Sequence, residues 1–302
     1  MRHKVLIIMS KSSGADSRKG LFRNRPQQSS LNVRHLQATS VWAKPKHIMS
    51  DRQKYTVGWI CAIHTEMVAA TVFLDKEHEK PDVPPNDNNA YTVGEIGKHN
   101  VVIAVLPAGE YGTASAASVA RDMVHAFPNI RIGLMVGIGG GVPTKRDIRL
   151  GDVVVSYPQD GHSGVFQYDF GKTHQDKMFQ YTGFLDQPPA VLRAALSTLR
   201  SRYEIHGHRI EDAIEGMFKK VPRLRKNYSR PELSSDRLFN SEVLHEVACT
   251  TCCTKDESNL RWRPERTDEE DNPAIHYGLI ASGNQLMRDA MIRDKLAEEK
   301  GS

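Results

Sequence analysis

The sequence predicts an α/β protein, on three observations. From Tyr55 onward, short apolar runs rich in β-branched residues alternate with longer stretches whose apolar residues recur at helical spacing. The chain has 302 residues, enough to bury the core of one large domain, and 39% of them are hydrophobic while 25% are charged, as in an ordinary globular protein. Its apolar runs are too short to cross a bilayer, so we expect no membrane contact.

The first half of the pattern predicts strands and helices in alternation. A strand over residues 56–63 precedes a helix from about 66 to 76, whose apolar residues form one face. Strands at 91–96 and 100–106 are expected to form a hairpin. A glycine loop then leads into a helix of small residues over 114–127. The backbone of such a helix can approach a sheet or a ligand closely, and tight packing explains its composition equally well.

The second half is less regular. A strand precedes a glycine cluster at 137–141, and a β-branched strand follows at 150–156. Residues 188–203 predict a helix, and residues 204–273 are charged and turn-rich, which indicates an excursion from the fold. A strand at 275–281 and an amphipathic stretch at 285–299 complete the pattern.

The glycine cluster, with four glycines in the five residues 137–141, is the strongest indication of function. A dinucleotide fingerprint starting at Gly137 would need a glycine where Val142 stands and a helix where Pro143 stands. The chain has a Gly-Lys-Thr at residues 171–173, but a phosphate loop would also need a glycine at position 166, where Phe166 stands. A tight hairpin without a ligand is the alternative. Because four glycines exceed the need of a turn, we favour a loop whose backbone contacts a small polar ligand.

The net charge of +5 belongs to the start of the chain. Residues 1–50 hold ten Lys and Arg and the single acid Asp16, which leaves the remainder with a net charge of −4. A nucleic-acid surface is therefore not expected on the globular part. We expect residues 1–50 to be a basic disordered extension, of which 1–48 are dispensable, and the domain to span 51–302. The location expected is the cytoplasm, or mitochondria if residues 1–48 act as a transit peptide.

Three of the four cysteines, Cys249, Cys252 and Cys253, lie close together near His245. A closed zinc site usually draws on two separated pairs of ligands, and no second pair is present in the sequence. We therefore expect reduced cysteines in a loop and no metal.

Five segments, in this order and spacing, resemble the nucleoside phosphorylase superfamily, which includes methylthioadenosine nucleosidases, in a variant found in fungal receptor-like proteins. The resemblance covers residues 55 to 299. The segments are 58–66, 108–113, 136–142, 150–156 and 277–283. It implies a three-layer α/β/α fold with a central mixed sheet. In that family a Glu-Met-Glu segment and a later Asp follow the last helix seen here, so the last strands are expected to be missing.

The resemblance implies cleavage of the N-glycosidic bond of purine nucleosides. The ribose gains oxocarbenium-like charge in this reaction, so the nucleophile must be oriented on one face of the sugar. Glu66 matches the family's glutamate that orients the attacking water. Without the resemblance, Glu66 would be interpreted as a glutamate stabilised in the first turn of a helix.

The same resemblance assigns the remaining candidate residues. The substrate-binding residues expected are Gly112, Thr113, Gly137, Gly139, Gly140, Ser282 and Asn284. The first loop, residues 61–66, holds no Arg or Lys to bind phosphate, which favours hydrolysis, with phosphate as an alternative co-substrate and no other cofactor. A homo-oligomer is also implied. A nucleoside-sensing module of a fungal defence or signalling receptor, with impaired catalysis, is the alternative function.

Overall fold

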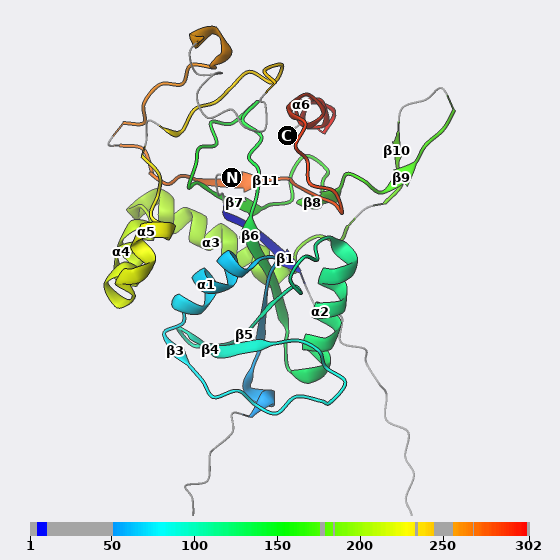
Figure 1. The fold of residues 1–302 in the computed structure, drawn as a ribbon, viewed down its shortest axis with the longest axis vertical. Helices are drawn as coiled ribbons and strands as arrows, with labels where there is room; N and C mark the ends of the chain where they lie inside the picture. Colours follow the sequence, from blue (N-terminus) through cyan, green and yellow to red (C-terminus); the bar gives the residue numbers. More distant parts are fainter. Residues whose placement is uncertain are drawn as a thin grey trace, which may run out of the picture.

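The computed structural model describes residues 5–10, 51–175, 179–183, 185–232, 235–244, 256–267 and 269–300. An eight-stranded mixed sheet forms its centre, with strand order β11-β7-β1-β6-β2-β5-β4-β3 (Figure 1). These strands are β1 (Val5–Ser10), β2 (Val57–Cys61), β3 (Lys76–Glu77), β4 (Tyr91–Ile96), β5 (His99–Val105), β6 (Ile132–Ile138), β7 (Val153–Ser156) and β11 (Ile275–Gly278). Two short pairs lie outside this sheet: β8 (Val165–Gln167) with β12 (Ile280–Ser282), and β9 (Gly171–Lys172) with β10 (Gln180–Tyr181).

Helices cover both faces of the sheet. They are α1 (His64–Val72), α2 (Thr113–Ala126), α3 (Ala190–His206), α4 (Ile210–Lys220), α5 (Arg225–Tyr228) and α6 (Ala290–Glu299). Short 3₁₀ turns occupy Arg52–Lys54, Pro222–Leu224 and Glu257–Asn259. In the part of the chain that the structure describes, no helix is long and apolar enough to cross a membrane.

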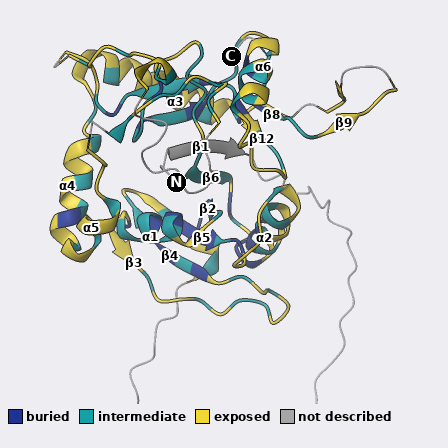
Figure 2. Ribbon diagram, turned by 45° about the horizontal axis from the view of Figure 1, so that its top comes forward, coloured by how far each residue is buried: buried dark blue, intermediate teal, exposed yellow. Residues whose placement is uncertain are grey.

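Strand β5 shows why the sheet carries helices on both sides. Its residues Val101 and Ile103 belong to a core cluster with Ala70 and Leu74 of the α1 region. The alternate residues Val102 and Ala104 lie in a second cluster that contains the α2 residues Val119, Met123 and Ala126. Because successive side chains of a strand point to opposite faces, α1 and α2 must cover different faces. The three-layer α/β/α arrangement is therefore confirmed, and buried residues gather on these elements while α4 stays largely exposed (Figure 2).

The middle of the sheet is parallel. Strand β2 pairs in parallel with β5 on one side and with β6 on the other, whereas β4 runs antiparallel to β5. From β5 the chain passes through α2 and enters β6 on the far side of β2. The direction of winding thus reverses beside β2, and the carboxyl ends of β2, β5 and β6 lie at the same edge of the sheet. Open α/β sheets bind ligands at this kind of edge.

The strands flanking the glycine cluster do not form a hairpin. Strand β1 lies between them, antiparallel to β6 and parallel to β7. The alternative of a tight hairpin at residues 137–141 is therefore wrong, because β6 and β7 are not neighbours in the sheet.

The same strand corrects the expectation of disorder for residues 1–50 at its six positions, Val5–Ser10. An apolar run of this length satisfies its backbone hydrogen bonds by pairing with two neighbours. The other residues up to 50 lie outside the described ones.

The expected elements are otherwise present with shifted ends. The hairpin of β4 and β5 is confirmed, and the strand expected at 275–281 is divided into β11 and β12, which lie in different sheets. The excursion expected at 204–273 contains α4 and α5, which its charged composition did not suggest.

Candidate functional site

The carboxyl edge of β2, β5 and β6 brings together the loops that carry most of the predicted site residues. Glu66 follows β2, Thr113 follows β5 at the start of α2, and Gly137 is the last residue but one of β6. The parallel pairing of these three strands places all three loops at one edge. The topology therefore supports a shared site, and the hydrogen bonds there divide into two groups.

The first group surrounds the Glu66 carboxylate, which is 9% exposed. Its Oε2 accepts hydrogen bonds from the backbone N–H groups of Ala62, at 2.6 Å, and Ile63, at 3.2 Å. Its Oε1 accepts one from the N–H of Ile138, at 2.7 Å. The bond to Ile63 is the one that a glutamate at the third position of a helix makes in a capping box. The bond to Ile138 goes beyond capping, because it ties the end of β2 to the end of β6.

The second group joins α2 to the segment after β12. The Asn284 side-chain oxygen accepts hydrogen bonds from the backbone N–H and from the hydroxyl of Thr113, both at 2.9 Å. Gly112 has φ of +93°, and a Cβ there would lie 2.8 Å from the same oxygen. A glycine is thus required both by the backbone conformation and by the approach of Asn284.

Asp169 holds Asn284 from the other side. Its Oδ2 accepts the backbone N–H of Asn284 at 2.5 Å, and its Oδ1 accepts a hydrogen bond from the side chain of Gln167 at 2.8 Å. Partial burial would raise the pKa of Asp169, but these hydrogen bonds and one from the Asn284 side chain outweigh it and lower the pKa. Asp169 was not among the predicted site residues.

The remaining predicted residues have less defined surroundings. Gly139 and Gly140 directly follow β6, and no atom lies within 4 Å of the position that a Cβ of Gly140 would take. Ser282 ends β12, where it pairs with Gln167 of β8 and its carbonyl accepts the N–H of Tyr168. The structure thus groups Glu66 with Gly137, and Gly112 and Thr113 with Asn284.

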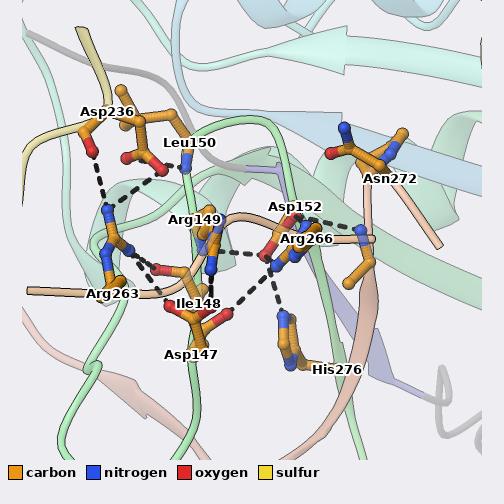
Figure 3. Close-up of polar contacts among 12 residues, drawn as sticks. Asp147, Ile148, Arg149, Leu150, Asp152, Asp236, Arg263, Arg266, Asn272 and His276 are labelled. Carbon is orange, nitrogen blue, oxygen red and sulfur yellow. Dashed lines mark hydrogen bonds and ion pairs between the residues drawn. The ribbon is translucent and has the colours of Figure 1, made fainter. Parts of the chain in front are cut away.

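A buried ionic network, which sequence reasoning missed, anchors the loop that follows the glycine cluster (Figure 3). Asp152 is fully buried and accepts two hydrogen bonds from Arg266, at 2.7 and 2.6 Å. His276 lies 2.9 Å from Asp152, and the N–H groups of Arg149 and Ala274 also donate to it. Burial alone would raise the pKa of Asp152, but these five contacts together hold it well below its usual range.

A second arginine extends this network. Arg263 contacts Asp147 at 3.3 Å and the Asp236 carboxylate at 3.1 Å (Figure 3). Arg263 and Arg266 belong to the excursion, whereas Asp147 and Asp152 precede β7. The excursion therefore fastens the loop between β6 and β7, and we assign the network a structural role in supporting the candidate site.

Glu66 does not line the hollow that the described residues form beside α6. This hollow, of about 480 Å³, is bounded by Thr144, Ser241 and the α6 residues Met291 and Asp294. The candidate site is therefore defined by its hydrogen bonds and its place in the sheet.

Metal ligands do not gather in the described ranges, where no group of three or more His, Cys, Asp or Glu residues is placed to hold an ion. The cysteine cluster at 249–253 and His245 lie outside the described residues, so the expectation about zinc stays a prediction.

Comparison with known proteins finds a fungal relative of this chain. It is 42% identical over 251 residues to a nucleotide-binding leucine-rich repeat (NLR)-like protein of the fungus Hyaloscypha variabilis. The match covers 82% of this chain and 24% of that protein, so the chain spans about a quarter of its relative's length. No protein-family model and no solved structure matches the chain.

Proposed function

We propose that this chain is the nucleoside-recognising domain of an NLR-like protein and that it hydrolyses the N-glycosidic bond of purine nucleosides. The observation that carries the proposal is the Glu66 carboxylate, which is buried at the carboxyl ends of β2 and β6, beside the point where the winding of the sheet reverses. The order of segments shared with nucleoside phosphorylases supports the choice of substrate.

In the proposed reaction Glu66 accepts a hydrogen bond from a water molecule and orients it toward C1′ of the ribose. The oxygen of the water bonds to C1′ as the bond to the base breaks, and the electron pair of that bond leaves with the base. The base gains one proton and the water loses one, so the products are ribose and free base. Orientation and proton acceptance by one carboxylate typically contribute about 10² to 10⁴ in rate.

Hydrolysis is favoured over phosphorolysis by the groups around Glu66. The loop from Cys61 to Glu66 supplies backbone N–H donors that the carboxylate already occupies, and it contains no Arg or Lys. A phosphate would meet the negative charge of the carboxylate without a compensating cation from this loop.

A sensing function without turnover is the second candidate, and the NLR-like relative is the observation that favours it. In this case the nucleoside occupies the same edge of the sheet. The two hydrogen bonds from Thr113 to the Asn284 side chain, called the clamp below, change when it binds.

One experiment separates the two functions. The purified chain is incubated with adenosine, inosine, methylthioadenosine and ATP, with and without phosphate, and free base is quantified by chromatography. Hydrolysis predicts release without phosphate, which Glu66→Gln slows by about 10²-fold or more while nucleoside binding persists. Glu77→Gln, on the exposed strand β3, is the matched control and should not change the rate. Binding without release from any substrate would instead support the sensor.

A further inference from the structure

The Glu66 carboxylate has almost no freedom to move. Three backbone N–H groups, from Ala62, Ile63 and Ile138, donate to it. A carboxylate has about four acceptor positions, so roughly one remains for a water molecule or a ligand. Any displacement of the side chain would leave at least one of these partly buried N–H groups without its acceptor, at a cost in free energy.

Gly137 lies directly against this carboxylate. A Cβ on Gly137 would be 2.6 Å from Oε1, 2.8 Å from Cδ and 2.9 Å from Oε2 of Glu66. All three distances are shorter than real Cβ contacts, so either the carboxylate or β6 would have to shift. The flexible end of a free side chain could turn away, but the end of Glu66 is held by three hydrogen bonds.

The backbone gives no other reason for a glycine here. Gly137 lies within the extended strand β6 and outside the positive-φ region, where glycine is favoured. Any residue could adopt its backbone conformation. Gly112, by contrast, has φ of +93° and needs to be glycine for its conformation alone.

We propose that Gly137 is a positioning residue: the absence of its side chain makes the space that holds the Glu66 carboxylate on the N–H of Ile138. This inference rests on the proposed function for its catalytic consequence, and on the structure alone for its geometric one. A methyl group at position 137 displaces the carboxylate from Ile138 and thereby from the place where it orients water.

A thermal-melting cycle tests the geometry without any need for activity. Gly137→Ala is measured in the native background and in the Glu66→Ala background. The proposal expects a clear loss of melting temperature in the first and less than half of that loss in the second, because the colliding carboxylate is gone. Gly140→Ala, with open space around its Cβ, is the matched control and should change little. Equal losses in both backgrounds would overturn the proposal.

Gly137→Ala is expected to be folded but less stable than the native chain. Should Gly137→Ala yield no folded protein, folded protein recovered with Glu66→Ala/Gly137→Ala supports the proposal. Failure of the double variant as well, with Glu66→Ala folded, overturns it.

Kinetics test the catalytic consequence. Where the native chain releases base, Gly137→Ala should lower kcat about tenfold or more and change KM little. Gly216→Ala, in the exposed helix α4 and away from the candidate site, should retain kcat. An unchanged kcat in a folded Gly137→Ala variant would contradict positioning. A native chain that releases no base rejects the proposed hydrolysis, and the melting cycle still decides whether Gly137 makes room for Glu66.

Discussion

Asp152 and Arg266 form a two-point ion pair although 114 positions separate them in the sequence. The Nη1 and Nη2 groups of Arg266 donate to different oxygens of the Asp152 carboxylate, at 2.7 and 2.6 Å. The Asp152 side chain is 0% exposed and that of Arg266 is 8% exposed. The pair connects the excursion to the loop before β7, so the support of the candidate site depends on a contact between distant segments.

Removal of Arg266 should therefore destabilise the fold strongly. Arg266→Ala leaves the buried carboxylate of Asp152 without its main partner, and broken buried pairs typically cost about 3 to 5 kcal/mol. Urea unfolding followed by circular dichroism measures the change. Arg209→Ala is the matched control, because Arg209 pairs with Asp212 on the exposed surface and should cost less than about 1 kcal/mol. Similar losses in the free energy of unfolding for the two variants would show that the buried pair stabilises the fold no more than the exposed one.

Acid should remove the contribution of Asp152. Its pKa in the folded protein is lowered, whereas in the unfolded chain it stays near the usual value of about 3.9. The unfolded chain then binds more protons, so the stabilisation is complete above about pH 5 and is lost as the pH falls below that. Melting temperatures between about pH 6 and pH 3 should fall more steeply for the native chain than for Asp152→Asn. Parallel curves would argue against this source of acid sensitivity.

Cys61 should be unreactive in the folded protein. It is fully buried at the end of β2, and burial, together with the nearby Glu66 carboxylate, raises the pKa of its thiol to about 12. Only the thiolate reacts with alkylating reagents, so iodoacetamide at about pH 8 should leave Cys61 unmodified until the chain is unfolded. Peptide mass mapping distinguishes Cys61 from the other cysteines. Rapid alkylation under native conditions would mean that the end of β2 opens readily.

Local patterns predicted the parts of the fold that depend on neighbours in sequence. The hairpin of β4 and β5 followed from two apolar runs around a glycine turn, and Gly97 has φ of +58° there. The helix expected at 114–127 followed from its small residues, and the observed α2 begins one residue earlier than expected.

Contacts between distant segments escaped prediction for a physical reason. Strand β1 is separated from β6 by more than a hundred residues, and no periodicity within either strand specifies their pairing. The partners of Asp152 likewise come from charged segments that look like solvent-exposed loops in the sequence. Glu66 was predicted as a site residue through the resemblance, but its hydrogen bond to Ile138 depends on the parallel pairing of β2 and β6, which the sequence did not predict.

Gly216 offers a stabilising substitution. It lies inside α4, is exposed, and has no atom within 4 Å of the position of a Cβ. Alanine there reduces the conformational freedom of the unfolded chain, so Gly216→Ala should raise the free energy of unfolding by about 0.5 to 1 kcal/mol. Gly94→Ala is the contrasting control, because its Cβ would lie 2.4 Å from the carbonyl oxygen of Lys76, and it should destabilise. A loss of stability in Gly216→Ala would indicate that α4 packs differently.

The clamp between Thr113 and Asn284 should protect the start of α2. Asn284→Ala removes the acceptor of both the N–H and the hydroxyl of Thr113, which corresponds to the loss of a helix cap and costs about 1 kcal/mol. Hydrogen exchange, followed by mass spectrometry, should accelerate in peptides that contain the first turn of α2 and stay unchanged in β5. Thr113→Ser keeps both donors and serves as the matched control. Unchanged exchange after Asn284→Ala would show that the start of α2 is stable without these two hydrogen bonds.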